Sequence, residues 1–115
     1  MTVLNVTDST FDKEVIRSEL PVLIDFYADW CVSCIEMEKL TFTNPEVKTK
    51  LDQMLLLQAD VTANNDEDKA LLKRFGLFGP PGIILFDANG TEIRSARVIG
   101  FQPPAQFLES LQKAE

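Results

Sequence analysis

The chain has 115 residues, of which 45% are hydrophobic and 25% are charged, a size and balance that predict one folded domain spanning residues 1–115. Its 18 acidic and 11 basic residues give a formal net charge of -7, which argues against binding to nucleic acid or to anionic membrane surfaces. The longest apolar runs, Met54–Leu57 and Ile83–Phe86, are far too short to span a membrane, and no N-terminal stretch resembles a signal peptide. We expect a soluble, monomeric domain.

The N-terminal quarter predicts two strands separated by a helix. Val3–Val6 alternates enough to form a short strand, and residues 8–10 offer N-cap candidates for a helix that ends near Leu20. The apolar stripe of this helix is expected to consist of Phe11, Val15 and Ile16. Val22–Ala28 is apolar on both faces except at Asp25, as expected for a central parallel strand.

The middle of the chain predicts three helices and a second buried strand. The first helix is expected over Cys31–Phe42, and Pro45 ends it because proline disfavours a helical residue before it. A short helix over Glu46–Leu51 and a strand over Met54–Val61 follow. The next helix begins near Asp66 and ends at Gly76, a residue typical of helix C-termini.

The last part of the chain predicts a hairpin and a final helix. Ile83–Phe86 forms a strand, Asp87–Gly90 is a turn signal, and Glu92–Ile99 is expected to be the returning strand. Pro103 and Pro104 then open a helix with Phe107, Leu108 and Leu111 on its inner side. The order is βαβα, then βα, then ββα, with no internal repeat or linker.

The only two cysteines, Cys31 and Cys34, lie two residues apart between a strand pattern and a helix pattern. This arrangement is typical of thiol–disulfide redox chemistry, because a cysteine at a helix N-terminus meets unpaired N–H groups that stabilise a thiolate. A structural zinc site would need about four ligands, and the chain has no histidine. A purely structural disulfide would close too short a loop to constrain the unfolded chain. We therefore predict a redox-active pair with no metal and no other cofactor.

Two carboxylates are candidates for roles beside the cysteines. Asp25 lies among apolar residues, where a carboxylate is costly unless it is paired or protonated, which favours a proton acceptor or a source of electric field under the cysteines. The alternative is an edge or strand-end position open to water. Glu38 follows Cys34 by four residues and Cys31 by seven, so it lies on their face of the helix. The alternative is a solvated glutamate like the neighbouring Glu36.

The order of elements, with Trp30-Cys31-x-x-Cys34 after a strand that contains Asp25, resembles the thioredoxin fold. This resemblance implies an α/β fold with a central mixed sheet flanked by helices on both faces. Pro81, just before a strand, matches the cis-proline that faces the cysteines in that family. Thioredoxin itself differs at three places, where this chain has Val32-Ser33 between the cysteines, Lys39 for the helix-kinking proline, and Leu56 for the lysine near the aspartate.

A set of segments is similar to one branch of that family, the C-terminal periplasmic domain of the bacterial thiol:disulfide interchange protein DsbD. The segments are Tyr27–Cys34, Glu36–Lys39, Thr41-Phe42, Leu57–Asn64, Ala96–Val98 and Gly100-Phe101. One departure is Gly82, because threonine commonly follows the cis-proline.

The resemblance implies a domain of a larger inner-membrane protein, located in the periplasm and linked to cytochrome c biogenesis. Its partners would be a transmembrane domain of the same protein, which supplies electrons, and an N-terminal periplasmic domain, which receives them. Two alternatives remain open. One is a free-standing thioredoxin-like reductase with broad substrates, and the other is a redox-silent binding module.

Four residues have expected roles in attack and docking. Cys31, at the helix end where it can be exposed, is expected to attack, and the more buried Cys34 is expected to resolve the mixed disulfide. Trp30 and Phe78 are expected to flank the sulfurs as a flat apolar docking surface, with core packing as the alternative. Aromatic residues expected in the core are Tyr27 and Phe101.

Pro80 precedes the expected cis-proline Pro81, at a position that commonly pairs its backbone with an extended partner segment in this fold. Proline has no backbone N–H, so this position can accept a hydrogen bond but cannot donate one. We therefore expect weak, short-lived docking of arbitrary peptides. The alternative is that Pro80 only makes the loop rigid.

Overall fold

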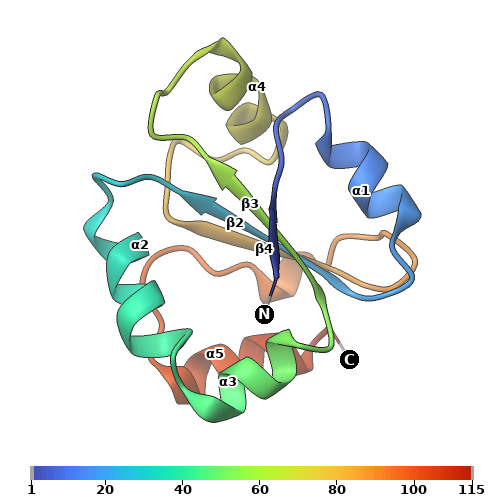
Figure 1. The fold of residues 1–115 in the computed structure, drawn as a ribbon, viewed down its shortest axis with the longest axis vertical. Helices are drawn as coiled ribbons and strands as arrows, with labels where there is room; N and C mark the ends of the chain where they lie inside the picture. Colours follow the sequence, from blue (N-terminus) through green and yellow to red (C-terminus); the bar gives the residue numbers. More distant parts are fainter. Residues whose placement is uncertain (1, 115) are drawn as a thin grey trace.

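The computed structural model describes residues 2–114 and centres on a mixed β-sheet (Figure 1). Over that range the sheet has four strands in the spatial order β1 (Val3–Asn5), β3 (Leu55–Asp60), β2 (Val22–Tyr27) and β4 (Gly82–Phe86). Strands β1 and β2 pair with β3 in parallel, whereas β4 is antiparallel to β2. The mixed sheet expected from the sequence is confirmed.

Helices cover both faces of this sheet, as predicted. The α-helices found in residues 2–114 are α1 (Phe11–Arg17), α2 (Val32–Glu36), α3 (Pro45–Leu51), α4 (Asp66–Arg74) and α5 (Pro104–Gln112). In Figure 1, α1 and α4 lie on one side of the sheet and α2, α3 and α5 on the other. None of the helices within the described range is long and apolar enough to cross a membrane.

Two cores form because successive residues of a strand point to opposite faces. The core beneath α1 and α4 contains Val22, Ile24 and Phe26 of β2 together with Phe11, Val15, Leu71 and Leu72. The opposite core contains Leu23 of β2 together with Met37, Val47, Leu51, Phe107 and Leu111. Burial on both faces explains why β2 is an almost continuous apolar run. Asp25 shares the face of Leu23, beneath the active-site helix.

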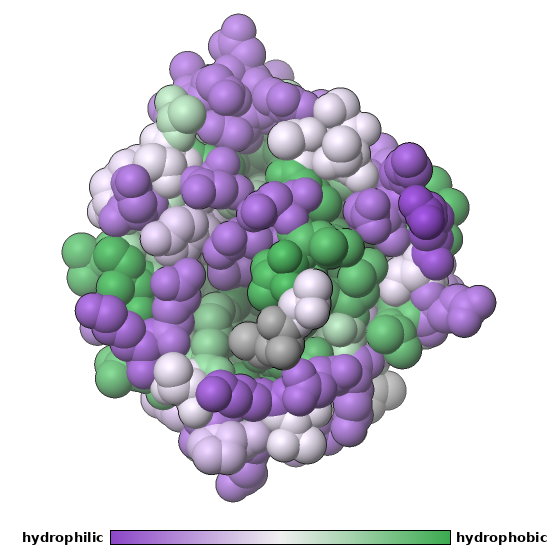
Figure 2. Space-filling view, in the orientation of Figure 1, coloured by the Kyte–Doolittle hydropathy of each residue, from purple (hydrophilic) through white to green (hydrophobic). Residues whose placement is uncertain are grey.

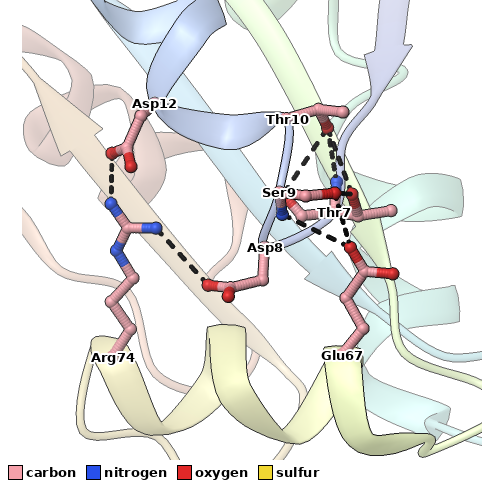
Figure 3. Close-up of polar contacts among 7 residues, drawn as sticks. All are labelled: Thr7, Asp8, Ser9, Thr10, Asp12, Glu67 and Arg74. Carbon is pink, nitrogen blue, oxygen red and sulfur yellow. Dashed lines mark hydrogen bonds and ion pairs between the residues drawn. The ribbon is translucent and has the colours of Figure 1, made fainter.

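Polar contacts tie the loop before α1 to α4 (Figure 3). The backbone N–H and the hydroxyl of Ser9 donate to the Glu67 carboxylate at 3.3 and 2.8 Å. Arg74 pairs with Asp8 at 3.4 Å and also with Asp12. These contacts hold α4 beside α1, and they lie on the side of the sheet away from Asp25.

The predicted returning strand over Glu92–Ile99 is wrong. Two isolated bridges, Phe86–Glu92 and Ile83–Val98, replace it. An uninterrupted antiparallel ladder starting at Phe86–Glu92 would place Val98 opposite Pro80, three residues from its actual partner. The segment is therefore too long for a regular ladder, and the 3₁₀ turn η2 (Arg94–Ala96) takes up the extra residues.

The first helix is shorter than the sequence predicts. It ends at Arg17 rather than near Leu20, because Ser18 is extended and its hydroxyl donates to the Leu20 carbonyl at 2.8 Å. Ile16 is 81% exposed and does not belong to the predicted apolar stripe, since it follows the buried Val15 and points about 100° away. The other strands and helices are confirmed, with ends displaced by one or two residues.

The active-site helix changes its winding after one turn. Helix α2 continues as the π-helical segment η1 (Met37–Thr41), in which the Phe42 N–H donates to the Met37 carbonyl at 2.8 Å. Lys39, at the position of the family's kinking proline, lies inside η1. The fully buried Thr41 donates its hydroxyl to the Gln102 carbonyl at 2.5 Å, which anchors this segment to the loop before α5.

Thr41→Val should lower the free energy of unfolding by about 1–2 kcal/mol, because valine keeps the shape but leaves the Gln102 carbonyl without its partner. The matched control is Thr43→Val, which removes an exposed hydroxyl bonded to the Lys39 carbonyl at 2.8 Å. That change should cost less than about 0.5 kcal/mol. Urea unfolding measures both. Equal losses would contradict an anchoring role for Thr41.

Candidate functional site

The two cysteines lie where the central strand β2 gives way to α2. Cys31 is the N-cap of α2, and its Sγ accepts a hydrogen bond from the Cys34 N–H at 3.2 Å. The two residues form a disulfide with a Cα–Cα distance of 5.3 Å. The predicted position of the pair at a helix N-terminus is therefore confirmed.

Both sulfurs are covered in this disulfide form. Cys31 is 6% exposed and Cys34 is 4% exposed, and both belong to the core that contains Phe26 and Ala28. The expectation of a clearly more exposed Cys31 is wrong here, because the bonded sulfur packs against that core. The Cys34 sulfur also lies 3.8 Å from the Phe26 carbonyl oxygen.

Asp25 occupies a setting that disfavours its charged form. It lies half-buried within β2, and burial, followed by the negative charge of Glu38, raises its pKa to about 7. A hydrogen bond from the Gln58 side chain acts in the opposite direction. The strand-end alternative is wrong, because β2 is a central strand that continues beyond Asp25.

Gln58 is a site residue that the sequence did not reveal. It lies directly opposite Asp25 in the parallel register of β2 and β3. Within the sequence, Gln58 is one polar residue in a strand, and its pairing depends on a register that a single sequence does not display. The partner of Asp25 is therefore an amide from a neighbouring strand.

A pocket of about 270 Å³ reaches Asp25, Glu38 and Gln58. Its remaining lining is mostly apolar and comes from β1, β2, β3, α3 and the end of η1, namely Val3, Leu23, Phe42, Thr43, Lys48, Leu51, Leu56 and Leu57. Apolar residues gather at the centre of the face viewed in Figure 2, near the sheet edge formed by β1. The structure thus brings the two predicted carboxylates to one site.

The proline loop lies beside the cysteines. The Pro80–Pro81 peptide bond is cis, as the resemblance predicts. Gly82 then pairs with Phe26, whose carbonyl lies next to the Cys34 sulfur. A Cβ on Gly82 would come within 3.0 Å of the Leu77 side chain, so Leu77 occupies the space that threonine would need.

Aromatic side chains stand at the surface near this loop and near Cys31. Trp30 is 58% exposed and Phe78 is fully exposed, so the core-packing alternative for both is wrong. The prediction that Phe101 belongs to the core is also wrong, because it is 37% exposed. Tyr27 is half-buried and packs against the core, as predicted. Among residues 2–114, no cluster of three or more potential ligands would hold a metal ion.

Comparisons with known proteins agree with this geometry. The family described as thioredoxin-like domain matches residues 12–115. The thiol:disulfide interchange protein DsbD of Ralstonia nicotianae is 58% identical over 94 residues, which are 82% of this chain and 15% of that protein. The DsbD C-terminal domain of Neisseria meningitidis, in its oxidised form, has a TM-score of 0.74 and 37% identity, covering 94% of this chain and 89% of that one. Thioredoxin f from spinach chloroplast has a TM-score of 0.75 and 26% identity, with coverages of 97% and 92%.

The cysteine pair at the start of α2, the mixed sheet and the family match together define a class, and the chain belongs to the thioredoxin-like family. Within this family it groups with the C-terminal domains of DsbD, to which the Neisseria structure belongs. The chain spans only 15% of the length of the Ralstonia relative.

The raised pKa of Asp25 predicts that stability falls as pH rises. The folded protein holds the Asp25 proton up to about pH 7, whereas the unfolded chain releases it near pH 4, so this group destabilises the fold increasingly between those values. Between pH 5 and pH 8 the wild type should lose on the order of 2–3 kcal/mol relative to Asp25→Asn. Urea unfolding of the disulfide form at each pH measures this. Glu36→Gln is the control, because it removes a carboxylate from α2 without removing Asp25. Parallel pH profiles for wild type and Asp25→Asn would refute the prediction.

Proposed function

We propose that the chain is a thiol–disulfide oxidoreductase domain whose Cys31–Cys34 pair reduces a disulfide in a partner protein. The observation that carries this proposal is the cysteine pair at the N-terminus of α2, which forms a disulfide directly after the strand that contains Asp25. Membership of the thioredoxin-like family supports it.

The reaction proceeds through two thiol–disulfide exchanges. In the reduced domain, the Cys31 thiolate attacks one sulfur of the partner disulfide, which forms a mixed disulfide and releases the other sulfur as a thiolate. Cys34 then loses its proton and attacks Cys31, which closes the Cys31–Cys34 disulfide and releases the second partner thiol. Two electrons and two protons pass to the partner.

Asp25 is the proton acceptor in this scheme. Its pKa of about 7 means that both protonation states are populated near neutral pH, so it can take the Cys34 proton and later release it. Glu38 and Gln58 adjust this balance in opposite directions, since Glu38 raises the Asp25 pKa and Gln58 lowers it. The site therefore holds a base tuned by two neighbours.

The same carboxylates make the domain a reductant. The start of α2 stabilises a thiolate on Cys31, but negative charge on Asp25 or Glu38 and the apolar surroundings disfavour it. A thiolate that gains little stabilisation leaves the reduced form less stable, so electrons pass more readily to the partner. A protonated Cys31 reacts slowly in free solution, and docking of the partner has to activate it.

Docking uses the surface around the disulfide. The exposed side chains of Trp30 and Phe78 supply apolar contact area, and the loop at Pro80 and Pro81 supplies backbone. Because Pro80 has no N–H, an extended partner segment receives no hydrogen bond there. A missing bond costs around 1 kcal/mol, which keeps the docking of arbitrary peptides weak and short-lived.

The partners that we propose are domains of the same protein. The chain is similar to one part of DsbD, and the relatives are several times longer than the chain. In this proposal the chain is a periplasmic domain of an inner-membrane protein. It takes electrons from the transmembrane domain and gives them to the N-terminal periplasmic domain.

Replacing each cysteine in turn tests the order of attack and the partner. Cys34→Ser should form a mixed disulfide and stall there, because the resolving sulfur is absent, whereas Cys31→Ser should form none. Non-reducing electrophoresis after incubation with the oxidised N-terminal domain of a DsbD relative, or with insulin, measures the trapped complex.

The outcome separates the proposals. Capture of the N-terminal domain in strong preference to insulin supports a relay, whereas equal capture of both indicates a broad reductase. Trapping by Cys31→Ser but not by Cys34→Ser would reverse the assigned roles. If the wild-type cysteine pair exchanges with neither disulfide, the chain is a redox-silent binding module.

A further inference from the structure

The indole of Trp30 is exposed but held at one edge. Although 58% of the residue is exposed, its Nε1–H donates to the Thr62 carbonyl at 3.1 Å. An exposed aromatic side chain normally samples several rotamers, and this contact favours one of them. Trp30 directly precedes Cys31, so the orientation of its ring shapes the surface next to the disulfide.

Thr62 is itself fixed by two aspartate residues. Its backbone N–H and its hydroxyl both donate to Asp60 Oδ1, at 2.9 and 2.5 Å. The hydroxyl oxygen in turn accepts the Asp29 backbone N–H at 2.9 Å. The Thr62 hydroxyl therefore donates to the Asp60 carboxylate and accepts the Asp29 backbone N–H, so it acts both as a donor and as an acceptor.

This network joins two segments that leave the sheet side by side. Strands β2 and β3 are parallel, so both end at the same edge of the sheet, and the Val61 N–H donates to the Tyr27 carbonyl at 2.7 Å just beyond that edge. The contacts of Thr62 continue this pairing into the loop that carries Asp29 and Trp30. The turn Asp60–Thr62 thus supports the active-site loop from outside the cysteine motif.

We propose that Thr62, held by Asp60, is a positioning residue that fixes the Trp30 indole beside the Cys31–Cys34 pair, so that a partner docks on a preformed surface. An ordered side chain loses less conformational entropy on binding than a mobile one, which strengthens docking without a new contact. The inference rests on the proposed reductase function, because the indole orientation matters only if a partner binds next to the disulfide.

Thr62→Val tests this directly, because valine keeps the β-branched shape and removes only the hydroxyl. The chain has one tryptophan, so its indole N–H gives a single NMR signal whose exchange with solvent reports the contact. A lost hydrogen bond of around 1 kcal/mol corresponds to about a fivefold change. We expect indole exchange to quicken about fivefold and KM for reduction of the oxidised N-terminal domain of a DsbD relative to rise about fivefold, with kcat unchanged.

Two further variants and a control complete the experiment. Thr62→Ser keeps the hydroxyl and should restore both values, and Asp60→Ala should reproduce the defect if Thr62→Val folds poorly. Thr49→Val removes a hydroxyl bonded to the Pro45 carbonyl in α3, outside the cysteine loop and the docking residues, and should change neither value.

Several results would overturn the inference. Unchanged indole exchange in Thr62→Val, or a serine variant as defective as the valine variant, would show that the hydroxyl does not hold the indole. Faster exchange with an unchanged KM would show that indole order does not affect docking. A wild type without reductase activity would overturn the proposed function and this inference with it. Failure of the inference alone would appear as equal KM values in active variants.

Discussion

The Cys31 sulfur accepts the Cys34 N–H at 3.2 Å because Cys31 caps the first turn of α2, and the proposed redox chemistry depends on this contact. Alone, this contact would stabilise a thiolate on Cys31 and so stabilise the reduced form of the domain. Asp25 and Glu38 line one pocket, and we propose that their negative charge opposes this thiolate. The proposed strength of the domain as a reductant is the balance of these opposed effects.

The fold assembles that balance from distant parts of the chain. The carboxyl comes from β2, its amide partner from β3, and its charged neighbour from η1. The buried hydroxyl of Thr41 and the Gln102 carbonyl fix η1 against the segment before α5, which holds Glu38 beside the pocket. The Asp60–Thr62 turn contacts the loop before the cysteines through the Trp30 indole.

The sequence predicted the elements whose cause is local. The spacing of the cysteines, the run around Asp25 and the proline and glycine breaks predicted each α-helix found in residues 2–114 and the paired strands. Features that depend on tertiary contacts were not predictable in the same way. Gln58 is a partner of Asp25 because of the strand register, which a single sequence does not display. The returning strand was predicted wrongly because the segment has more residues between its two bridges than a regular ladder can pair. Phe101 was expected in the core but lies at the surface. The π-helical winding of η1 also has no local signal such as a proline.

Titration of the Cys31 thiol in the reduced protein tests the central claim most directly. Thiolate absorbance followed against pH, in wild type, Asp25→Asn and Glu38→Gln, gives the pKa, with Glu36→Gln as the matched control. The account predicts a wild-type pKa at or above the free-cysteine value of about 8.5, and a lower pKa once Asp25 or Glu38 loses its charge. A wild-type pKa well below about 7, or no decrease in either variant, would contradict it.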